Sequence, residues 1–328
     1  MNRPNRLAPL VVLIAVMISA SSLLAQDPDG KRALPIEDYG LWRSITSTAI
    51  SDDGNWISFA YRKREADDSL YVKNLRTDKE YLIPCASRAQ FSDDSRWVAY
   101  MVTLPFEEAE KLREDKKPVP NKAELMNLET GEKMTWENSA SFSFPKGSSH
   151  FAVKKAKADP KAKHRGTDLI LRNLREGYEE LIGSVAQFSF NKPGTILAYA
   201  VDTADKDGNG LYMIHLESGI RRPLDNDKAT YERMTWDEEG TALAVLKGDE
   251  KKGFEEKENV LLAFTALGEG TFTPHEYNPA DASDFPEDMV ISEKGTLSWN
   301  EDATMVFFGI KEQKEKPGGR KEEEEKEE

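Results

Sequence analysis

Serine and cysteine side chains that could act as nucleophiles are scattered through the 328-residue sequence without the spacing that catalysis needs. A serine nucleophile at a strand-to-helix turn carries the pattern Gly-x-Ser-x-Gly, which occurs nowhere in the chain. Gly147-Ser148-Ser149 and Gly183-Ser184-Val185 lack the second glycine. The only cysteine, Cys85, ends an apolar segment and has no paired base. We therefore expect a buried, inert thiol and no catalytic residue in this chain.

Metal ligands are equally scattered. The histidines fall in different predicted strands and loops, without the spacing of a metal pair: His150, His164, His215 and His275. Asp205 to Gly210 matches the first six positions of an EF-hand loop, but the twelfth position is Leu216 and the flanking segments are strands. We predict a plain loop there, with no metal and no cofactor site.

The composition excludes some partners. The formal net charge is −14, which argues against binding to nucleic acid or to anionic membrane surfaces. One cysteine allows no internal disulfide.

The N-terminus has the features of an export signal. Basic residues at Arg3 and Arg6 precede an apolar run, Leu10 to Ala20, that is too short to span a membrane. Residues 1–25 are predicted to be a signal peptide and 26–43 a lead-in, and the mature protein is expected to be periplasmic or secreted. The alternative is a retained membrane anchor.

One pattern recurs six times: an apolar anchor, a small residue four positions later, and an apolar strand. The anchors are Ile50, Phe91, Phe144, Phe190, Trp236 and Trp299. The small residues are Gly54, Ser95, Ser148, Gly194, Gly240 and Ala303. Consecutive anchors are 41, 53, 46, 46 and 63 residues apart. A period of about 40–50 residues with several strands per unit is typical of a β-propeller.

The fourth copy shows the expected unit of four strands. The first strand ends at Phe190, the second covers 195–201, the third 211–216 and the fourth 220–224. We predict an all-β fold of four-stranded propeller blades over residues 44–310. Four tryptophans are predicted to fill the space between blades: Trp56, Trp97, Trp236 and Trp299.

Three long connections between second and third strands are rich in charge: residues 105–122, 154–166 and 247–258. We expect them to be solvated and to emerge from one edge of the blades.

The sixth copy holds only two strands, and a charged segment, residues 311–328, follows. We expect about five complete blades and a half blade in an incomplete ring. The last segment is interpreted either as a disordered acidic tail or as a truncated insert, and truncation is favoured because the half blade has an open edge.

The repeats Ile50-Ser-Asp-Asp-Gly-Asn-Trp-Ile-Ser-Phe59 and Phe91-Ser-Asp-Asp-Ser-Arg-Trp-Val-Ala-Tyr100 resemble the WD-like repeats of TolB-type propellers and of the prolyl oligopeptidase family. The lead-in, residues 34–43, resembles that of exported bacterial members of the latter family. In that family the propeller caps an α/β-hydrolase domain, which holds the catalytic residues. The propeller filters peptides by size before they reach that domain. The resemblance implies a non-catalytic propeller portion, with a hydrolase domain downstream and peptides as substrates.

Two other functions remain open. A free-standing periplasmic propeller could act as a scaffold that binds other envelope proteins, and it would need no catalytic residue. A sugar- or polyol-acting enzyme would need acids clustered at corresponding repeat positions, which the sequence lacks. The peptidase interpretation is favoured, so whether the chain is itself part of an enzyme depends on sequence after Glu328.

Overall fold

The computed structural model describes residues 35–268 and 270–316. The predicted signal peptide, part of the lead-in and residues 317–328 lie outside this range. Two compact units divide the chain: residues 1–43 with 63–65, and the remaining residues. In the described part of the first unit, the helical turn η1 (Ile36–Leu41) precedes Trp42, whose ring lies edge-on to that of Tyr39 at 4.7 Å.

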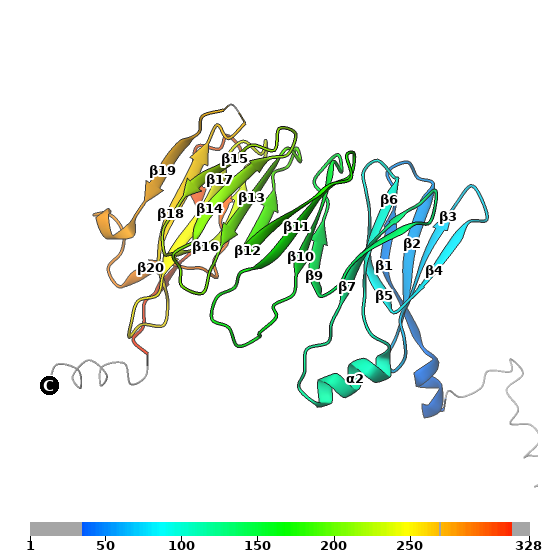
Figure 1. The fold of residues 1–328 in the computed structure, drawn as a ribbon. Coiled ribbons are helices and arrows are strands. Elements are labelled where there is room, and N and C mark those ends of the chain that lie inside the picture. Colours follow the sequence, from blue (N-terminus) through cyan, green and yellow to red (C-terminus); the bar gives the residue numbers. More distant parts are fainter. Residues whose placement is uncertain (1–34, 269, 317–328) are drawn as a thin grey trace, which may run out of the picture. The chain divides into compact units, whose positions relative to one another are not determined.

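The second unit consists of antiparallel sheets that follow one another along the chain (Figure 1). The first sheet contains β1 (Arg43–Ile50), β2 (Trp56–Lys63), β3 (Ser69–Asn74) and β4 (Glu80–Pro84). The second contains β5 (Ala86–Phe91), β6 (Trp97–Val102), β7 (Lys122–Asn127) and β8 (Lys133–Trp136). The fifth contains β16 (Thr230–Trp236), β17 (Leu243–Asp249), β18 (Glu258–Thr265) and β19 (Thr273–Tyr277). Strand order equals chain order in each.

The third and fourth sheets share one long strand. Their strands are β9 (Ser139–Ser143), β10 (His150–Lys155), β11 (Thr167–Asn173), β12 (Glu179–Phe190), β13 (Ile196–Val201), β14 (Gly210–His215) and β15 (Arg221–Asp225). The first half of β12 pairs with β11 and the second half with β13, and the register shifts next to Val185 on both sides. The strand β12 is therefore the last strand of the third unit and the first strand of the fourth.

Each sheet is apolar on both faces, because alternate residues of its strands pack in opposite directions. In β6, Val98 and Tyr100 pack against the first sheet, whereas Ala99 and Met101 pack against the third. Five such clusters join the six consecutive units in chain order. Successive four-stranded antiparallel sheets packed in this way are the blades of a β-propeller, as the repeats predict.

The predicted role of the tryptophans is confirmed. Trp56 is buried, and Trp97, Trp236 and Trp299 are partly buried against the clusters between sheets. The indole Nε1 of Trp299 also donates a hydrogen bond to the carbonyl of Thr235 at 3.0 Å, which ties the sixth unit to the fifth.

The residue after each anchor explains why the turn recurs. Ser51 Oγ accepts a hydrogen bond from the amide of Trp56, five residues later, at 2.9 Å. The equivalent acceptors are Ser92, Asn191, Asp237 and Asn300, which bind the amides of Trp97, Ile196, Ala242 and Met305. The third copy has Pro145 at this position. In five of the six copies a short polar side chain thus closes the turn that places the second strand beside the first.

The long connections differ from the predicted loops. Residues 105–122 contain the helix α2 (Phe106–Glu114), which buries Ala109 and carries Glu107 and Glu108 in its first turn, where the helix dipole favours negative charge. The strands β10, β17 and β18 extend into the other two predicted connections. High charge indicated solvation correctly but could not exclude a short surface helix.

Neighbouring connections contact each other, in agreement with the prediction that they share one edge. The amide of Phe106 donates to Asp67 at 2.7 Å, that of Arg165 to Asp202 at 2.6 Å and that of Glu255 to the carbonyl of Lys314 at 2.8 Å. A second short helical turn, η2 (Pro279–Asp281), follows β19.

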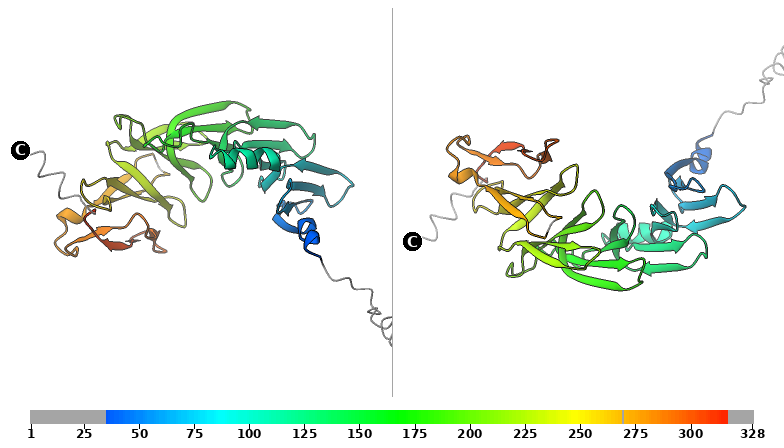
Figure 2. Two further views of the ribbon diagram at one scale, coloured as in Figure 1. Left: turned by 90° about the horizontal axis from the view of Figure 1, so that it is seen from below. Right: turned by 90° about the horizontal axis from the view of Figure 1, so that it is seen from above.

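The sixth unit is a broken hairpin, visible beside the fifth sheet in Figure 2. It comprises β20 (Met289–Ile291), β21 (Ser298–Trp299), β22 (Val306–Phe307) and β23 (Ile310–Glu312), with β20 paired to β23 and β21 to β22. This confirms the predicted hairpin. Order was expected to end at Ile310, but it continues: Phe254 bridges to Glu315, and Gln313 exchanges hydrogen bonds with the backbone of Glu256. Pairing with the neighbouring connection supplies contacts that composition alone does not reveal.

No helix among residues 35–268 and 270–316 has the length and apolar character that crossing a membrane requires.

Candidate functional site

The serines of the two glycine–serine pairs make hydrogen bonds to the backbone of neighbouring segments. Ser148 is buried in a turn and accepts a hydrogen bond from the amide of Asp93 at 2.8 Å. The carbonyl of Ser184 accepts one from the amide of Asp202. Ser149 Oγ lies 3.0 Å from Nδ1 of His150, but no carboxylate in the described part of the chain hydrogen-bonds to that ring. The orienting third member of a catalytic triad is therefore missing from this pair.

The other three histidines lie in separate surroundings and do not form a group with other potential catalytic or metal-binding side chains in the described part of the chain. His215 ends β14, His275 Nε2 lies 3.3 Å from Thr265 Oγ1, and Nδ1 of His164 is buried without a hydrogen bond. Among the described residues, no group of three or more His, Cys, Asp or Glu side chains could hold a metal ion.

Cys85 lies between β4 and β5, where its backbone is left-handed with φ 55°. Its side chain is buried, as predicted. Burial, assisted by the Asp67 carboxylate, raises the pKa of the thiol above its ordinary value. A protonated, buried thiol is a poor nucleophile.

The segment Asp205 to Gly210 is a connection between β13 and β14, not a loop between helices. Its carboxylates have protein partners. Asp205 accepts hydrogen bonds from Thr203 Oγ1 at 2.9 Å and from the amide of Asp207, and Asp207 pairs with Lys228 at 2.7 Å. Asn209 is buried and holds the connection against the carbonyl of Ala229. These contacts shape the loop itself.

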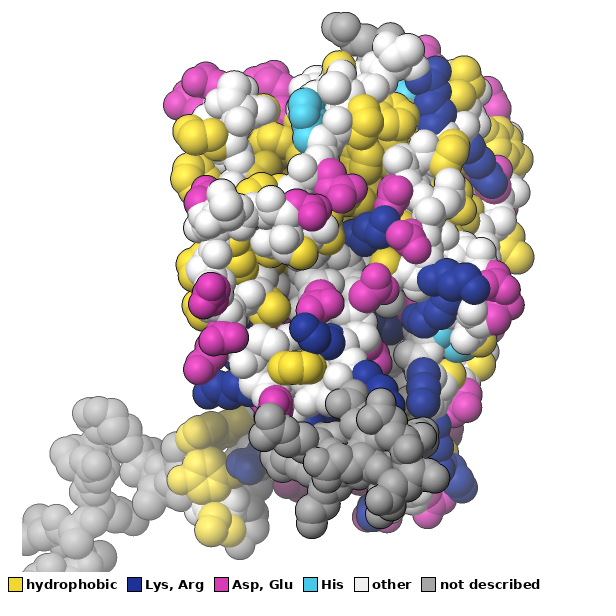
Figure 3. Space-filling model, turned by 90° about the vertical axis from the view of Figure 1, so that its left-hand side faces the viewer, with side chains coloured by type: hydrophobic (Ala, Val, Ile, Leu, Met, Phe, Trp, Pro, Cys, Tyr) yellow, Lys and Arg dark blue, Asp and Glu magenta, His cyan; other side chains and the backbone are white. Residues whose placement is uncertain are grey.

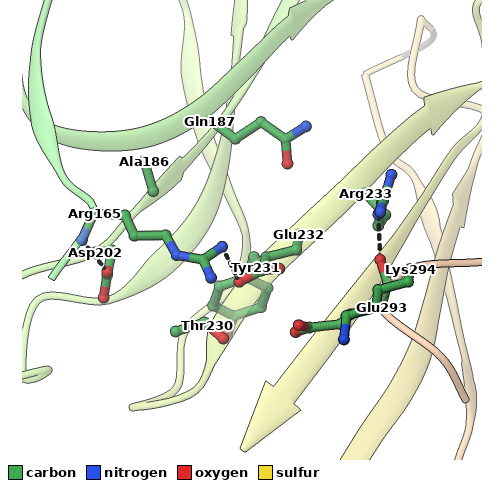
Figure 4. A pocket seen from close by; sticks show the side chains of 10 residues that line it. All are labelled: Arg165, Ala186, Gln187, Asp202, Thr230, Tyr231, Glu232, Arg233, Glu293 and Lys294. Carbon is green, nitrogen blue, oxygen red and sulfur yellow. Dashed lines mark hydrogen bonds and ion pairs between the residues drawn. The ribbon is translucent and has the colours of Figure 1, made fainter. Parts of the chain in front are cut away.

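A pocket of about 400 Å³ opens between the first strands of the fourth and fifth sheets (Figure 4). Its walls come from β12, β16, the connection before β11, the end of β13 and the segment after β20. The lining residues are Arg165, Ala186, Gln187, Asp202, Thr230, Tyr231, Glu232, Arg233, Glu293 and Lys294. They lie within the second unit and combine three carboxylates with three cations.

The three carboxylates all have partners within the protein. Glu232 pairs with Arg165 at 2.7 Å and with Lys257 at 2.8 Å. Glu293 pairs with Lys257 at 3.2 Å. Asp202 pairs with Lys206 at 2.5 Å.

The charge on Asp202 is stabilised despite its burial. Burial acts to raise the pKa of this carboxyl, but the Lys206 ammonium and the Arg165 amide outweigh it and hold the pKa below its ordinary value. Asp202 is therefore ionised at neutral pH and is held as part of the pocket wall.

Two donors in the pocket remain available to a ligand. Arg233 uses Nε to donate to the carbonyl of Glu293, and its two terminal nitrogens have no partner in the described part of the chain. The carboxamide of Gln187 has none either, and Figure 4 shows it extending across the pocket toward the side of Arg233. Lys294 makes only a long ion pair of 3.8 Å with Glu256 and is largely exposed. The pocket therefore offers hydrogen-bond donors.

A backbone irregularity positions Arg233. Its φ is 61°, and the register between β16 and β17 shifts between Glu232 and Thr235. A non-glycine residue in this conformation costs about 1–2 kcal/mol, and a bulge re-aims the side chains of the strand. The same left-handed conformation recurs in the first strands of the first two sheets, at Ser47 with φ 52° and at Arg88 with φ 57°, and the register of β5 also shifts there.

The repeat relates these residues, although the sequence prediction did not include them. Arg233 lies three residues before its anchor Trp236, and Gln187 lies three before Phe190. Ser47 and Arg88 occupy the same place, and the amide of Arg88 donates to Ser47 Oγ at 2.9 Å. Comparing this position across the repeats would have indicated a row of polar residues on the innermost strands.

The surroundings have no single sign of charge. Figure 3 shows acidic and basic side chains interspersed with hydrophobic ones on the side where β18 to β20 lie.

Comparison with known proteins gives matches in structure only. No family model matches the sequence, and no curated protein matches it. The chain is similar to the β-propeller domain of the Trilobed protease from Pyrococcus furiosus, with 13% identity, a TM-score of 0.42, and coverage of 83% of this chain and 78% of that one.

Two other solved structures differ from each other in activity. An acylaminoacyl peptidase from Pyrococcus horikoshii matches at 11% identity and a TM-score of 0.39, over 85% of this chain and 44% of that one. An oligogalacturonate lyase matches at 14% identity and a TM-score of 0.43, over 81% and 73%. The chain thus spans less than half the length of the peptidase. At these values the likenesses carry no argument about activity.

Proposed function

We propose that the chain is the non-catalytic propeller portion of an exported serine peptidase of the prolyl oligopeptidase type. The observation that carries the proposal is the repeat itself. The turn Ser51-Asp-Asp-Gly54, its second copy at Ser92 and the lead-in at 34–43 resemble that family, and the sheets that they begin have the strand order of propeller blades. The described residues contain no serine–histidine–acid arrangement, which suits a non-catalytic part.

In this proposal the propeller limits which peptides reach a hydrolase domain that follows it in the chain. A rigid stack of sheets suits such a role, because neighbouring blades are joined by buried apolar clusters and by hydrogen bonds between their turns. Peptides are the substrate class, and the α/β-hydrolase domain is the principal partner.

The coding sequence after Glu328 and the labelling of its product test the proposal. We expect a Gly-x-Ser-x-Gly segment downstream and labelling of the full-length protein by a fluorophosphonate, which reacts with activated serines. Residues 1–328 alone should not be labelled and should not hydrolyse peptides. A stop codon directly after Glu328, or labelling of a serine within residues 1–328, would contradict the proposal. In the first case, the scaffold function becomes the better account.

Export is a separate part of the proposal. Expression of the full-length gene in a bacterial host, followed by N-terminal sequencing of the periplasmic or secreted product, should show a new N-terminus close to residue 26. Recovery of the intact N-terminus in the membrane fraction would instead indicate the retained anchor.

A further inference from the structure

We propose that the pocket between β12 and β16 binds a carboxylate of a peptide, with Arg233 and Gln187 as the recognising side chains. This assignment rests on the proposed function for the peptide, because the pocket itself specifies only an anionic acceptor group. The two side chains come from the same repeat position of neighbouring blades, and both line the pocket.

The hydrogen-bond inventory favours an acceptor ligand. Each carboxylate of the pocket is already paired with Arg165, Lys206 or Lys257. Because each carboxylate already has a cation beside it, an amine ligand gains less there than it would beside an unpaired carboxylate. The terminal nitrogens of Arg233 and the amide of Gln187 have no such partner among residues 35–268 and 270–316, so a carboxylate gains hydrogen bonds there without breaking one within that part of the chain. A guanidinium presents two parallel donors that match the two oxygens of a carboxylate.

The backbone of Arg233 sets the direction of its side chain. Its left-handed conformation is shared by Ser47 and Arg88 at the same repeat position, so it belongs to the repeat and re-aims the side chain without by itself marking a ligand site. The Nε of Arg233 donates to the carbonyl of Glu293, which leaves the two terminal nitrogens of the guanidinium for a ligand (Figure 4).

The size of the pocket limits the ligand. A volume of about 400 Å³ accommodates one or two amino-acid residues and no folded partner. Either the C-terminus of a peptide or an acidic side chain would supply the group, and the experiment must separate the two.

Isothermal titration of the full 328-residue chain with three acetylated tripeptides makes this separation. The probes are acetyl-Ala-Ala-Phe with a free carboxylate, its C-terminal amide, and acetyl-Ala-Glu-Phe amide. We expect the free acid to bind about tenfold or more tightly than the plain amide, because a hydrogen bond to a charged group is lost. If the glutamate peptide amide binds as tightly as the free acid, the site recognises acidic side chains. If it binds as weakly as the plain amide, the site recognises peptide C-termini.

Variants locate the site. Arg233→Gln should weaken binding of the free acid about tenfold or more, and Gln187→Leu about fivefold. Arg88→Gln is the matched control, because Arg88 has the same repeat position and left-handed backbone but lies outside the pocket. It should bind like the unaltered chain. Circular dichroism of each variant verifies that it folds.

Four results would overturn the proposal. The first is equal affinity for the free acid and the plain amide, and the second is equal losses in the Arg233 and Arg88 variants. The third is tighter binding of inorganic phosphate than of any carboxylate peptide, and the fourth is no binding of any probe at millimolar concentration. A positive result would stand even if no hydrolase domain follows the chain, so the two proposals fail separately.

Discussion

At the scale of single residues, the turns between first and second strands are packed tightly across blade boundaries. Gly194 has φ 74°, and a Cβ atom at this position would overlap the backbone of Lys146 in the preceding blade. Gly54 occupies the same repeat position with φ 67°, yet no atom lies within 4 Å of the equivalent Cβ. Glycine is therefore required at position 194 both by the positive φ and by the close neighbour, and at position 54 by the positive φ alone.

The two glycines predict unequal losses of stability. Gly54→Ala should lower the free energy of unfolding by about 1 kcal/mol, the cost of a left-handed non-glycine residue. Gly194→Ala should lower it by about 3 kcal/mol or more, because the turn of the neighbouring blade must also move. Urea denaturation followed by tryptophan fluorescence measures both. Equal losses would show that the blades do not pack through these turns.

His150 predicts a dependence of stability on pH. Burial, only partly opposed by Glu176 and Glu180, lowers the pKa of His150 below its ordinary value of 6.5. Because the folded state holds the ring neutral, the stabilisation is present above the unfolded pKa and is lost as the pH falls through the folded pKa. The free energy of unfolding should therefore decrease between pH 7.5 and 5.5.

Substitution isolates this contribution. In His150→Gln, the part of the pH slope due to His150 should disappear. Urea unfolding at the two pH values provides the comparison. An unchanged slope in the His150 variant would assign the pH dependence to other groups.

The pocket illustrates which residues sequence reasoning could not bring together. Arg165, Gln187 and Arg233 lie in three different segments and form no linear motif. Only the strand pairing and the bulge at Arg233 place them around one cavity. The absence of a nucleophile motif, in contrast, could be read directly from the sequence, because that motif is local.

At the scale of elements, the residue after the anchor closes the first turn of the blade in five of the six copies, and in the fourth copy it also binds the next blade. Asn191 Oδ1 accepts hydrogen bonds from the amides of Thr195 and Ile196, both at 2.8 Å. Its Nδ2 donates to the carbonyl of Gly240 in the next blade at 2.9 Å. Asn300 makes the same bonds within its own turn, but it is only partly buried, and in the described part of the chain its side chain makes none to another blade.

Asn191→Ala should lower the free energy of unfolding by about 3 kcal/mol, because buried amides and a carbonyl lose their partners. Asn300→Ala, the matched control, should cost about 1 kcal/mol, since water replaces the lost bonds. Guanidinium denaturation of both variants gives the comparison. If Asn300→Ala lowered the free energy of unfolding as much as Asn191→Ala does, the hydrogen bond of Asn191 to the next blade would contribute nothing to stability.

The elements themselves were largely predictable, because alternation of apolar residues specifies strands wherever both faces of a sheet are buried. The strand β13, predicted at 195–201, covers Ile196–Val201. The charged segments were less predictable. α2 has only Ala109 buried, and residues 311–316 are held by pairing with residues 288–290 and 253–256, both distant in sequence. Periodicity cannot reveal an element whose stability comes from distant neighbours.

At the scale of the whole molecule, stability is distributed along a row of interfaces. Each inner sheet contributes to two of the five apolar clusters. Among the described residues, the first sheet and the last hairpin contribute to one each. When units contact only their neighbours, stability approximates a sum of unit and interface terms, so the end units should open first.

Hydrogen exchange followed by mass spectrometry tests this distribution. Amides of β11 to β14, flanked by interfaces on both sides, should exchange most slowly, and those of β1 to β4 and β20 to β23 most rapidly. Removal of residues 278–328 deletes the last interface, so protection should fall in β16 to β19, whose Leu246 and Leu261 become exposed, and remain unchanged in β5 to β14. A uniform loss of protection along the chain would show instead that the blades unfold as one cooperative body, with stability that cannot be assigned to separate interfaces.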